Sequence, residues 1–339
     1  MKSIGIDLGT SNTRIFLKGK GIVLREPSAV AVSERNEEVI AVGLDASRMA
    51  GKTPEDVTVR RPIKSGVIAQ FDASVAMVDV FMQKAVGNLS FHHPRVMVCV
   101  PYSINDVEKR AVEEVILEAG AKSVALIEAS MTAAIGAGLR VTHPRGSMIV
   151  DIGGGTTEIA VMSLGAIVVS RSIRAAGDAM DEAICDYIRR KFNVMVSETT
   201  AEYCKRSIGT AQKRSPDSTL PPKDMEIRGR NVITGLPTSI RLTGDDIAAA
   251  ISEVLAQIED AIREALENTP PELAADLLED GIVLSGGGAL LGGLCARISR
   301  ATHLKASIAK NPMDCSVLGF GRLLEYAGDV DRIIRFRTK

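Results

Sequence analysis

The sequence of 339 residues contains no tryptophan, and aromatic residues make up only 3% of it. This composition offers few side chains for base stacking and argues against a surface that binds nucleic acid. The 41 basic and 42 acidic residues leave a net charge of −1, so the chain as a whole does not attract a polyanion. We therefore expect no nucleic-acid partner.

Cysteine and histidine are also scarce, and their spacing does not indicate a metal site. The cysteines are scattered and include no Cys-x-x-Cys pair, which argues against a disulfide framework and favours a reducing compartment. The histidines have neither metal-ligand spacing nor an evident triad partner. The residues concerned are Cys99, Cys185, Cys204, Cys295 and Cys315, and His92, His93, His143 and His303.

Long apolar runs are missing as well. The first ten residues, MKSIGIDLGT, lack the apolar segment of a secretory signal, and no stretch approaches the roughly 18 apolar residues of a membrane span. We expect a cytoplasmic protein, which leaves a peripheral membrane contact open. Hydrophobic residues nevertheless form 45% of the chain, which is enough for a large core, and the length favours two domains.

One segment of the sequence occurs twice. Ile4–Leu17 (IGIDLGTSNTRIFL) is similar to Met148–Val161 (MIVDIGGGTTEIAV), and Asp7 aligns with Asp151 at an offset of 144 residues. Each copy predicts a strand that ends in an aspartate, a Gly/Thr turn and a second strand. Two similar lobes with their hairpin loops at a shared cleft are therefore predicted. Chance similarity between two glycine-rich hairpins is the alternative.

The remaining pattern alternates strands and helices. Val96–Val100 and Ser123–Ile127 predict strands, and Asn105 followed by Glu108 indicates a capped helix between them. In the second half, Thr243 is expected to cap a single helix whose apolar stripe continues to Leu266. This alternation predicts α/β layers.

Three glycine-rich turns are candidates for phosphate binding. Glycine lets the backbone approach a ligand closely, and successive N–H groups in such turns form anion sites. The sequence contains no G-x-x-x-x-G-K-[ST] motif, and the first two turns lack G-x-G-x-x-G spacing. Two similar loops that face each other could hold a polyphosphate from both sides. The turns are Gly9–Thr13, Gly153–Thr157 and Gly286–Ala289.

The aspartates before the first two turns indicate a cation. Asp7 and Asp151 would repel a nearby polyphosphate unless a cation lay between them. Magnesium often binds through few carboxylates, several waters and phosphate oxygens. One aspartate from each lobe, acting largely through water, fits that habit. The alternative is that each aspartate only organises its turn.

The glycine-rich motifs and several longer segments of the sequence resemble those of a known family. DLGTSNT, DIGGGTTE and SGGGALL are similar to the phosphate-1, phosphate-2 and adenosine motifs of the actin superfamily. Five further strings resemble MreB, the bacterial actin of rod-shaped cells. They are KGKGIVLREPSAVAV (Lys18–Val32), RPIKSGVIAQF (Arg61–Phe71), RGRNVITGLP (Arg228–Pro237), TPPELAAD (Thr269–Asp276) and NPMDCSVLGFG (Asn311–Gly321).

The resemblance implies an α/β, actin-like fold. Its two lobes would each have a duplicated mixed-sheet core and a smaller inserted subdomain, with the nucleotide cleft between the lobes. Lobe I is expected to comprise residues 1–145 and 315–339, with an insertion at about 33–65. Lobe II is expected to comprise residues 146–314, with an insertion at about 179–243.

The resemblance also implies a site for ATP and magnesium. Under this resemblance, Asp7 and Asp151 are again the residues expected to hold magnesium, largely through water. Glu202 and Lys205 match an E-x-x-K motif that holds the ribose and base. Their spacing places both on one helical face, and a surface ion pair between them is the alternative. The nucleotide-binding residues expected from the loops are Gly9, Thr10, Ser11 and Asn12, then Gly153, Gly154, Gly155 and Thr156, then Gly286, Gly287, Gly288 and Ala289.

The sequence departs from the family at the catalytic position. MreB proteins usually carry Glu-Glu-Pro where this chain has Glu128, Ala129 and Ser130. The second glutamate, together with the threonine matched by Thr156, is expected to position the attacking water, and Ala129 cannot do so. Because phosphoryl transfer depends on positioning and charge stabilisation, we expect slow hydrolysis and an intact phosphate site. Ser207 also replaces a glutamate that often faces the nucleotide.

The partners implied are those of a membrane-associated filament. The resemblance implies double protofilaments of the chain itself, contacts with other MreB paralogues and with cell-wall elongation proteins, and a position at the inner face of the cytoplasmic membrane. Leu89 and Phe91 are candidates for the membrane contact, and burial in the core is an equal alternative. A non-polymerising ATP-binding regulator of other MreB filaments and a sugar kinase of the same superfamily are the alternative functions.

Overall fold

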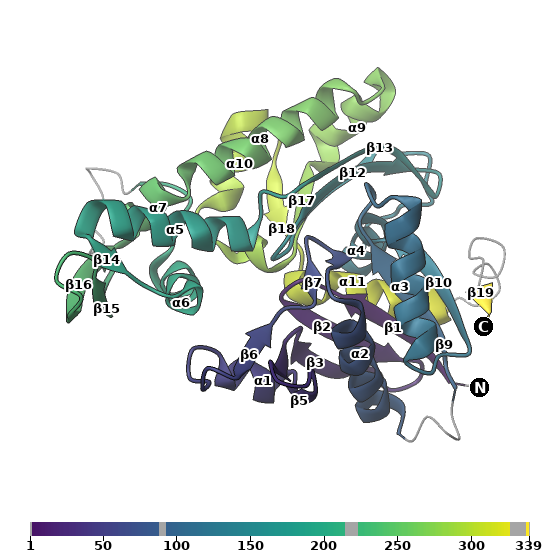
Figure 1. Cartoon of the computed structure of the whole chain (residues 1–339). Coiled ribbons are helices and arrows are strands. Elements are labelled where there is room, and N and C mark those ends of the chain that lie inside the picture. The colour runs from purple at the N-terminus through teal and green to yellow at the C-terminus, as the bar shows by residue number, and fades with distance from the viewer. Residues whose placement is uncertain (1, 88–92, 214–222, 326–336, 339) are drawn as a thin grey trace.

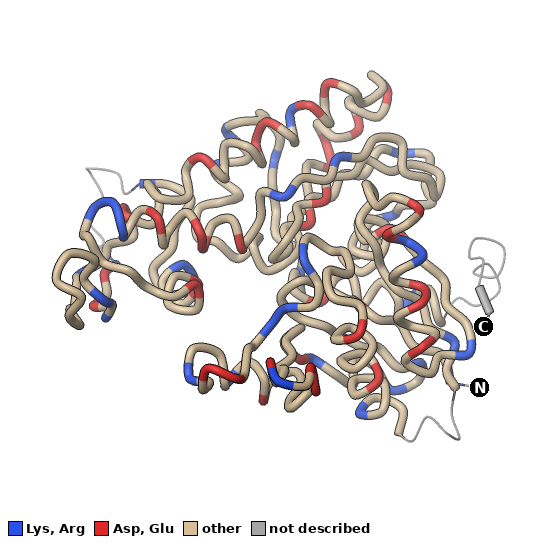
Figure 2. Tube along the Cα trace, in the orientation of Figure 1, with Lys and Arg blue, Asp and Glu red and all other residues tan. Residues whose placement is uncertain are grey.

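A computed structural model of the chain describes residues 2–87, 93–213, 223–325 and 337–338 (Figure 1). Two lobes are visible in Figure 1: one drawn mostly in purple and blue, the other in teal and green. Each is built on one mixed β-sheet. Lysine, arginine, aspartate and glutamate are interspersed over both lobes (Figure 2).

The first sheet has the strand order β19-β10-β9-β1-β2-β3. Strands β1, β2 and β3 form an antiparallel meander, whereas β9 and β10 follow parallel to β1. The strands are β1 (Ser3–Leu8), β2 (Asn12–Leu17), β3 (Gly21–Pro27), β9 (Arg95–Val100), β10 (Ser123–Glu128) and β19 (Arg337–Thr338).

The second sheet repeats this arrangement, with the order β13-β12-β11-β17-β18. Strands β11, β12 and β13 form the antiparallel meander, and β17 and β18 follow parallel to β11. The same topology in both sheets confirms the predicted duplication of a mixed-sheet core. The strands are β11 (Ser147–Ile152), β12 (Thr157–Ser163), β13 (Ala166–Ile173), β17 (Ile282–Ser285) and β18 (Ala306–Ile308).

Helices bury the outer face of each sheet. In the first lobe, Phe81 of α2 and Val115 of α3 pack on the apolar residues of β1 and β2. In the second lobe, Ile258 of α8, Leu277 of α9 and Ile298 of α10 belong to one core with β11. The bounds are α2 (Phe71–Val86), α3 (Asp106–Glu118), α8 (Ser252–Glu267), α9 (Pro271–Asp280) and α10 (Leu294–Thr302).

Two expected helix starts are present, but one predicted helix is divided. Asn105 and Glu108 form a reciprocal capping box at α3, and Thr243 caps α7 (Gly244–Ala250) through Asp246. The predicted single helix up to Leu266 is wrong, because Ile251 lies between α7 and α8 with φ −91° and ψ 1°. The apolar stripe remains buried on both sides of this break, so the spacing of apolar residues alone could not reveal it.

Two helices lie between the sheets. Helix α11 (Cys315–Glu325) packs Phe320 on the inner face of the first sheet, and α4 (Ala129–Ala137) packs on the second. They cross closely at two glycines: a Cβ atom at Gly136 would overlap the backbone of Cys315, and one at Gly319 would overlap that of Thr132. This crossing connects the two sheets and fixes their distance.

Each lobe also carries a smaller three-stranded sheet, in agreement with the predicted fold class. The first has the order β5-β4-β6 and the second β14-β15-β16, while the exact domain boundaries stay a prediction. The remaining elements are β4 (Val30–Ser33), β5 (Val39–Val42), α1 (Leu44–Met49), β6 (Val57–Arg60), β7 (Ile63–Lys64), β8 (Val67–Ile68), α5 (Gly177–Phe192), β14 (Val194–Met195), α6 (Glu198–Ile208), β15 (Asp224–Asn231), β16 (Pro237–Thr243), η1 (Gly287–Leu290) and η2 (Pro312–Asp314).

None of the helices within the described residues is both long enough and apolar enough to cross a bilayer. The predicted membrane-contact residues Leu89 and Phe91 lie outside the described residues.

Candidate functional site

A cavity of about 490 Å³ lies between the lobes, where β1, β11 and β17 end. All three glycine-rich loops reach it, together with both predicted magnesium aspartates. One predicted residue differs: Ala289 is fully buried in the core of the second lobe and does not line the cavity. The predicted residues that line it are Asp7, Gly9, Thr10, Ser11, Asn12, Ala129, Asp151, Gly153, Gly154, Gly155, Thr156, Glu202, Lys205, Gly286, Gly287 and Gly288.

The two hairpin loops touch each other across this cavity. A Cβ atom at Gly154 would overlap the Ser11 hydroxyl, and one at Gly155 would lie 2.5 Å from the Thr10 Oγ1 atom and 2.9 Å from the Ser65 Cα atom. Glycine is therefore required at both positions for the lobes to approach this closely. The contact places backbone N–H groups of both loops at one cavity.

The first loop is fixed by a serine that the sequence analysis did not identify. The Ser28 hydroxyl donates to the carbonyl of Gly9 at 2.6 Å and lies 2.9 Å from the Thr13 hydroxyl. The Thr10 hydroxyl accepts the N–H of Gly66 at 3.0 Å, and its own hydrogen stays available for a ligand. The loop is thus held in shape before a ligand binds.

The second loop is fixed by the equivalent threonine. The Thr157 hydroxyl, which aligns with that of Thr13, donates to the carbonyl of Ala175 at 2.6 Å. The N–H groups of Gly177 and Asp178 donate to the carbonyls of Gly153 and Gly154 at 3.1 and 2.8 Å. The start of α5 is therefore attached directly to this loop.

Asp7 and Asp151 both reach the cavity from beneath the loops. The Cys99 thiol donates to Asp7 Oδ1 at 3.2 Å, and the Ser285 hydroxyl donates to Asp151 Oδ1 at 2.7 Å. Burial is the main cause that raises the pKa of Asp151 to about 7, together with the charges of Asp7 and Glu158 and against the opposing hydrogen bond from Ser285. A cation at this place would relieve the repulsion.

The donor set fits magnesium held largely through water. Among the described residues, no group of three or more His, Cys, Asp or Glu side chains is arranged to hold a metal ion. A single carboxylate from each lobe suits Mg²⁺ when waters and phosphate oxygens complete its coordination. Two carboxylates that repel each other are therefore sufficient for such an ion, and a complete set of protein ligands is not needed.

Arg14, which the sequence analysis did not identify, partly neutralises these carboxylates. Its guanidinium lies 3.3 Å from Asp7 Oδ2 and 3.4 Å from Asp314 Oδ1, and all three side chains are largely buried. Arg14 lines the cavity and joins β2 to the start of α11 through Asp314. The alternation of side chains along β2 could have indicated which way Arg14 points. Its partner Asp314 could not be foreseen, because it is 300 residues away in the sequence.

Glu158 is a further carboxylate of the cavity. It is only 2% exposed, and it accepts the Ser172 hydroxyl at 2.6 Å and the Tyr102 N–H at 3.4 Å. Burial raises the pKa of Glu158 against these hydrogen bonds. Because Tyr102 belongs to the first lobe, Glu158 connects the lobes beside the cavity. Its position inside an apolar strand was visible in the sequence, but its partner was not.

The predicted E-x-x-K pair lies at the other end of the cavity. Lys205 Nζ donates to Asp181 Oδ2 at 2.8 Å and to the Gly177 carbonyl at 2.7 Å. Glu202 pairs with Arg206 at 3.7 Å, so the alternative of an ion pair between Glu202 and Lys205 is wrong. Asp181, which the sequence analysis did not identify, determines where the Lys205 ammonium lies.

The substituted catalytic position is at the start of α4. Ala129 lines the cavity, whereas Glu128 is the exposed N-cap residue and is not among the described lining residues. The buried Ser130 hydroxyl has no hydrogen-bond partner among the described residues. Ser207 is exposed and also does not line the cavity. The carboxylate missing at Ala129 is thus not replaced by that of Glu128.

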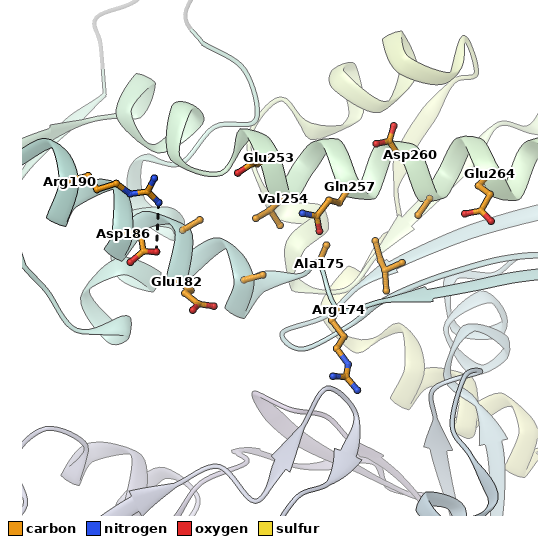
Figure 3. A pocket seen from close by; sticks show the side chains of 14 residues that line it. Arg174, Ala175, Glu182, Asp186, Arg190, Glu253, Val254, Gln257, Asp260 and Glu264 are labelled. Carbon is orange, nitrogen blue, oxygen red and sulfur yellow. Dashed lines mark ion pairs between the residues drawn. The ribbon is translucent and has the colours of Figure 1, made fainter.

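A second cavity, of about 700 Å³, lies between α5 and α8 (Figure 3). Carboxylates dominate its charged lining, and Asp186 pairs there with Arg190 at 3.8 Å. None of the three glycine-rich loops reaches it, and its acidic side chains would repel a polyphosphate. The cavity between the lobes is therefore the candidate site for such a ligand.

Comparison with known proteins identifies the family. A family model described as MreB/Mbl protein matches residues 1–332. The chain belongs to the MreB/Mbl family. It is 43% identical over 332 residues to the cell shape-determining protein Mbl of Bacillus cereus, with 98% of this chain and 97% of the relative covered. It is 46% identical over 328 residues to the cell shape-determining protein MreB of Escherichia coli, with 95% and 93% covered.

Solved structures confirm the predicted actin-like fold class. MreB5 of Spiroplasma citri, in structures bound to ADP and to AMPPNP, is 34% identical to this MreB/Mbl-family chain with a TM-score of 0.91 and 98% of both chains covered. The MamK double helical filament has a TM-score of 0.79 at 19% identity, with 96% and 98% covered. At that identity, the likeness to MamK concerns the fold alone.

The carboxylates around Arg14 yield a testable prediction. Arg14→Met should lower the free energy of unfolding by about 2–3 kcal/mol in protein free of magnesium and nucleotide, because it leaves the largely buried Asp7 without an ion pair and removes one of the two guanidinium partners of Asp314. The matched control is Arg25→Met, since Arg25 pairs with the same Asp314 at 2.9 Å but is 55% exposed. That control should cost less than about 1 kcal/mol. Urea unfolding measures both, and equal losses would contradict the assignment.

Proposed function

We propose that the chain binds ATP with magnesium between its lobes and assembles into filaments that take part in determining cell shape. The observation that carries the proposal is the contact of two similar glycine loops above two aspartates, one from each lobe. The ADP and AMPPNP bound in the MreB5 structures support the ligand. The names of the bacterial relatives support the role in cell shape.

In this proposal the loops bind the phosphates and the aspartates bind the cation. Backbone N–H groups of Gly154 and Gly155 and the hydroxyls of Thr10 and Ser11 would donate to phosphate oxygens. The N–H of Gly153 instead donates to the Thr156 carbonyl at 2.9 Å and holds the turn in shape. Asp7 and Asp151 would hold Mg²⁺ largely through water, and this ion supplies charge neutralisation to the triphosphate. On the adenosine side the site would be closed by Gly286–Gly288, Glu202 and Lys205.

Filament formation is proposed from family membership. Double protofilaments of the chain itself are the proposed assembly, and other MreB paralogues and cell-wall elongation proteins are proposed partners. Nucleotide binding at the contact between the lobes can influence assembly because it fixes the relative position of the surfaces on each lobe. A non-polymerising regulator would bind ATP in the same way, so polymer measurements separate these functions.

Binding and assembly can be measured on the same purified protein. We expect calorimetric heat with Mg·ATP and sedimenting polymer in its presence. The double change Asp7→Ala and Asp151→Ala should lower the ATP affinity at least about tenfold, since the cation loses both carboxylates. Asp106→Ala, which changes an exposed carboxylate on α3, is the control and should bind as the parent does.

The outcomes separate the candidate functions. A parent protein that gives no heat with Mg·ATP would contradict the whole proposal. ATP binding without polymer, either alone or with an added MreB paralogue, would contradict the filament and leave the regulator. Phosphate transfer from ATP to a sugar would instead favour the kinase.

We further propose that this chain hydrolyses ATP slowly. Ala129 lies at the cavity in the place where the family has a water-positioning glutamate, and Thr156 remains as its expected partner. The alanine methyl group can neither accept a proton nor orient a water molecule. The phosphate loops do not depend on Ala129, so ATP affinity and turnover should be separable.

Restoring the missing carboxylate tests this hypothesis. Ala129→Glu should raise steady-state phosphate release at least about tenfold, because a positioned general base typically contributes 10²–10⁴-fold. The ATP affinity should change little. Glu128→Ala is the matched control at the neighbouring exposed residue, and it should leave the rate as in the parent. A parent that is already as fast as Ala129→Glu would disprove slow hydrolysis through this substitution.

A peripheral position at the inner face of the cytoplasmic membrane is also proposed. It rests on family membership and on two apolar residues of the GNLSFHHP segment, Leu89 and Phe91. The double change to serine should abolish cosedimentation with vesicles of anionic phospholipid, because burial of apolar side chains drives such contacts. The polymer yield in solution serves as the control for folding, and unchanged cosedimentation would refute these residues.

A further inference from the structure

Asp181 is an incompletely paired carboxylate at the wall of the cleft between the lobes. The residue is 6% exposed and lines this cavity. Oδ2 is bound by Lys205 Nζ at 2.8 Å, whereas Oδ1 has no hydrogen-bond partner among the described residues. A carboxylate can accept about four hydrogen bonds, so Asp181 can accept further hydrogen bonds at Oδ1. A buried acceptor without a partner is rare in native proteins and requires an explanation.

The surroundings of Asp181 favour a neutral hydrogen-bond donor over a phosphate. Burial is the main cause that raises the pKa of Asp181 to about 6, together with the nearby charges of Glu202 and Asp178 and against the ion pair with Lys205. Each of these three carboxylates is paired with one cation: Asp178 with Arg61, Asp181 with Lys205 and Glu202 with Arg206. The place therefore offers no surplus positive charge for a polyphosphate, whereas the hydroxyl groups of a sugar are neutral donors that can bond the unpartnered Asp181 oxygen.

The position of Asp181 relative to the phosphate loop selects the ribose. Lys205 Nζ, the partner of Asp181, also bonds the carbonyl of Gly177, whose own N–H donates to Gly153 in the second phosphate loop. Asp181 is thus one helical turn along α5 from a phosphate-binding loop. In a nucleoside triphosphate, the ribose is the group that lies between the phosphates and the base.

We propose that the Asp181 carboxylate accepts a hydrogen bond from a ribose hydroxyl and makes the cleft selective for ribonucleotides over deoxyribonucleotides. Lys205 holds one oxygen, and the terminal torsion of aspartate is broad enough to turn the other toward the cavity. This inference rests on the proposed binding of ATP. It adds a specificity-determining residue to that site, outside the E-x-x-K pair.

The test compares ATP, 2′-deoxy-ATP and 3′-deoxy-ATP, each with magnesium, by calorimetry on the full chain at pH 8. A site that bonds a hydroxyl rejects the analogue without it, because its own polar group is then left unpaired. The parent should bind at least one deoxy analogue about tenfold more weakly than ATP. Asp181→Ala should bring the affinities for ATP and that analogue to within about twofold, mainly by weakening ATP.

A control and a second variant keep the test decisive. Glu182→Gln changes the neighbouring carboxylate of α5, which lines the second cavity and is not among the described residues that line the cleft, and it should leave the ratio of the affinities as in the parent. If Asp181→Ala does not fold, Asp181→Asn takes its place. Its neutral oxygen accepts a weaker bond than a carboxylate, so the ratio should fall at least about threefold.

Each result decides between the interpretations. A parent that binds all three nucleotides equally well overturns the inference and leaves the proposed function intact. The inference is also overturned if the Asp181 variant loses affinity for all three nucleotides by the same factor, since this would show that Asp181 only positions Lys205. A parent that binds none of them instead contradicts the proposed function itself.

Discussion

The close approach of two hairpin loops over two like-charged carboxylates is the constraint on which the rest of the structure depends. Gly154 and Gly155 lack side chains that would hold the loops of the second lobe away from Ser11, Thr10 and Ser65. That contact brings Asp7 and Asp151 to one cavity, where burial and the charge of Asp7 disfavour the charged form of Asp151. A bound cation and polyphosphate would exchange this repulsion for attraction, which couples ligand binding to the relative position of the lobes.

The fold supports this contact at a distance from it. Helices α4 and α11 cross at glycines between the two sheets, so the sheets cannot slide freely past each other. Arg14 joins Asp7 in the first hairpin to Asp314 at the start of α11. The same structural elements that separate the lobes therefore also orient a cavity carboxylate. Movement of one lobe would change the distances between the charged groups of the site. By linkage, a ligand that binds these groups would in turn influence the position of the lobes.

The cavity divides into regions of different chemistry. Near the loops, N–H groups and hydroxyls suit phosphates, while the unpartnered Asp181 oxygen suits a neutral donor. At Ala129 the wall presents only a methyl group, whereas Thr156 of the second loop supplies a hydroxyl to the same cavity. Binding and hydrolysis place separate demands on these regions, because holding a triphosphate requires donors and charge whereas hydrolysis also requires an oriented water. A family member can thus keep its ability to bind a triphosphate while its rate of hydrolysis falls.

The sequence by itself determined the duplicated strand–turn–strand units, the glycine loops and the two aspartates, because these depend on short spacings that a linear pattern records. It also determined the family, since its strings extend over nearly the whole chain. The pairing of Arg14 with Asp314, of Glu158 with Tyr102 and of Lys205 with Asp181 was decided only by the tertiary structure. Ala289, which the motif placed at the nucleotide, points into the core because η1 turns its Cβ inward. Side-chain direction and long-range pairing depend on packing between distant segments, which local spacing does not encode.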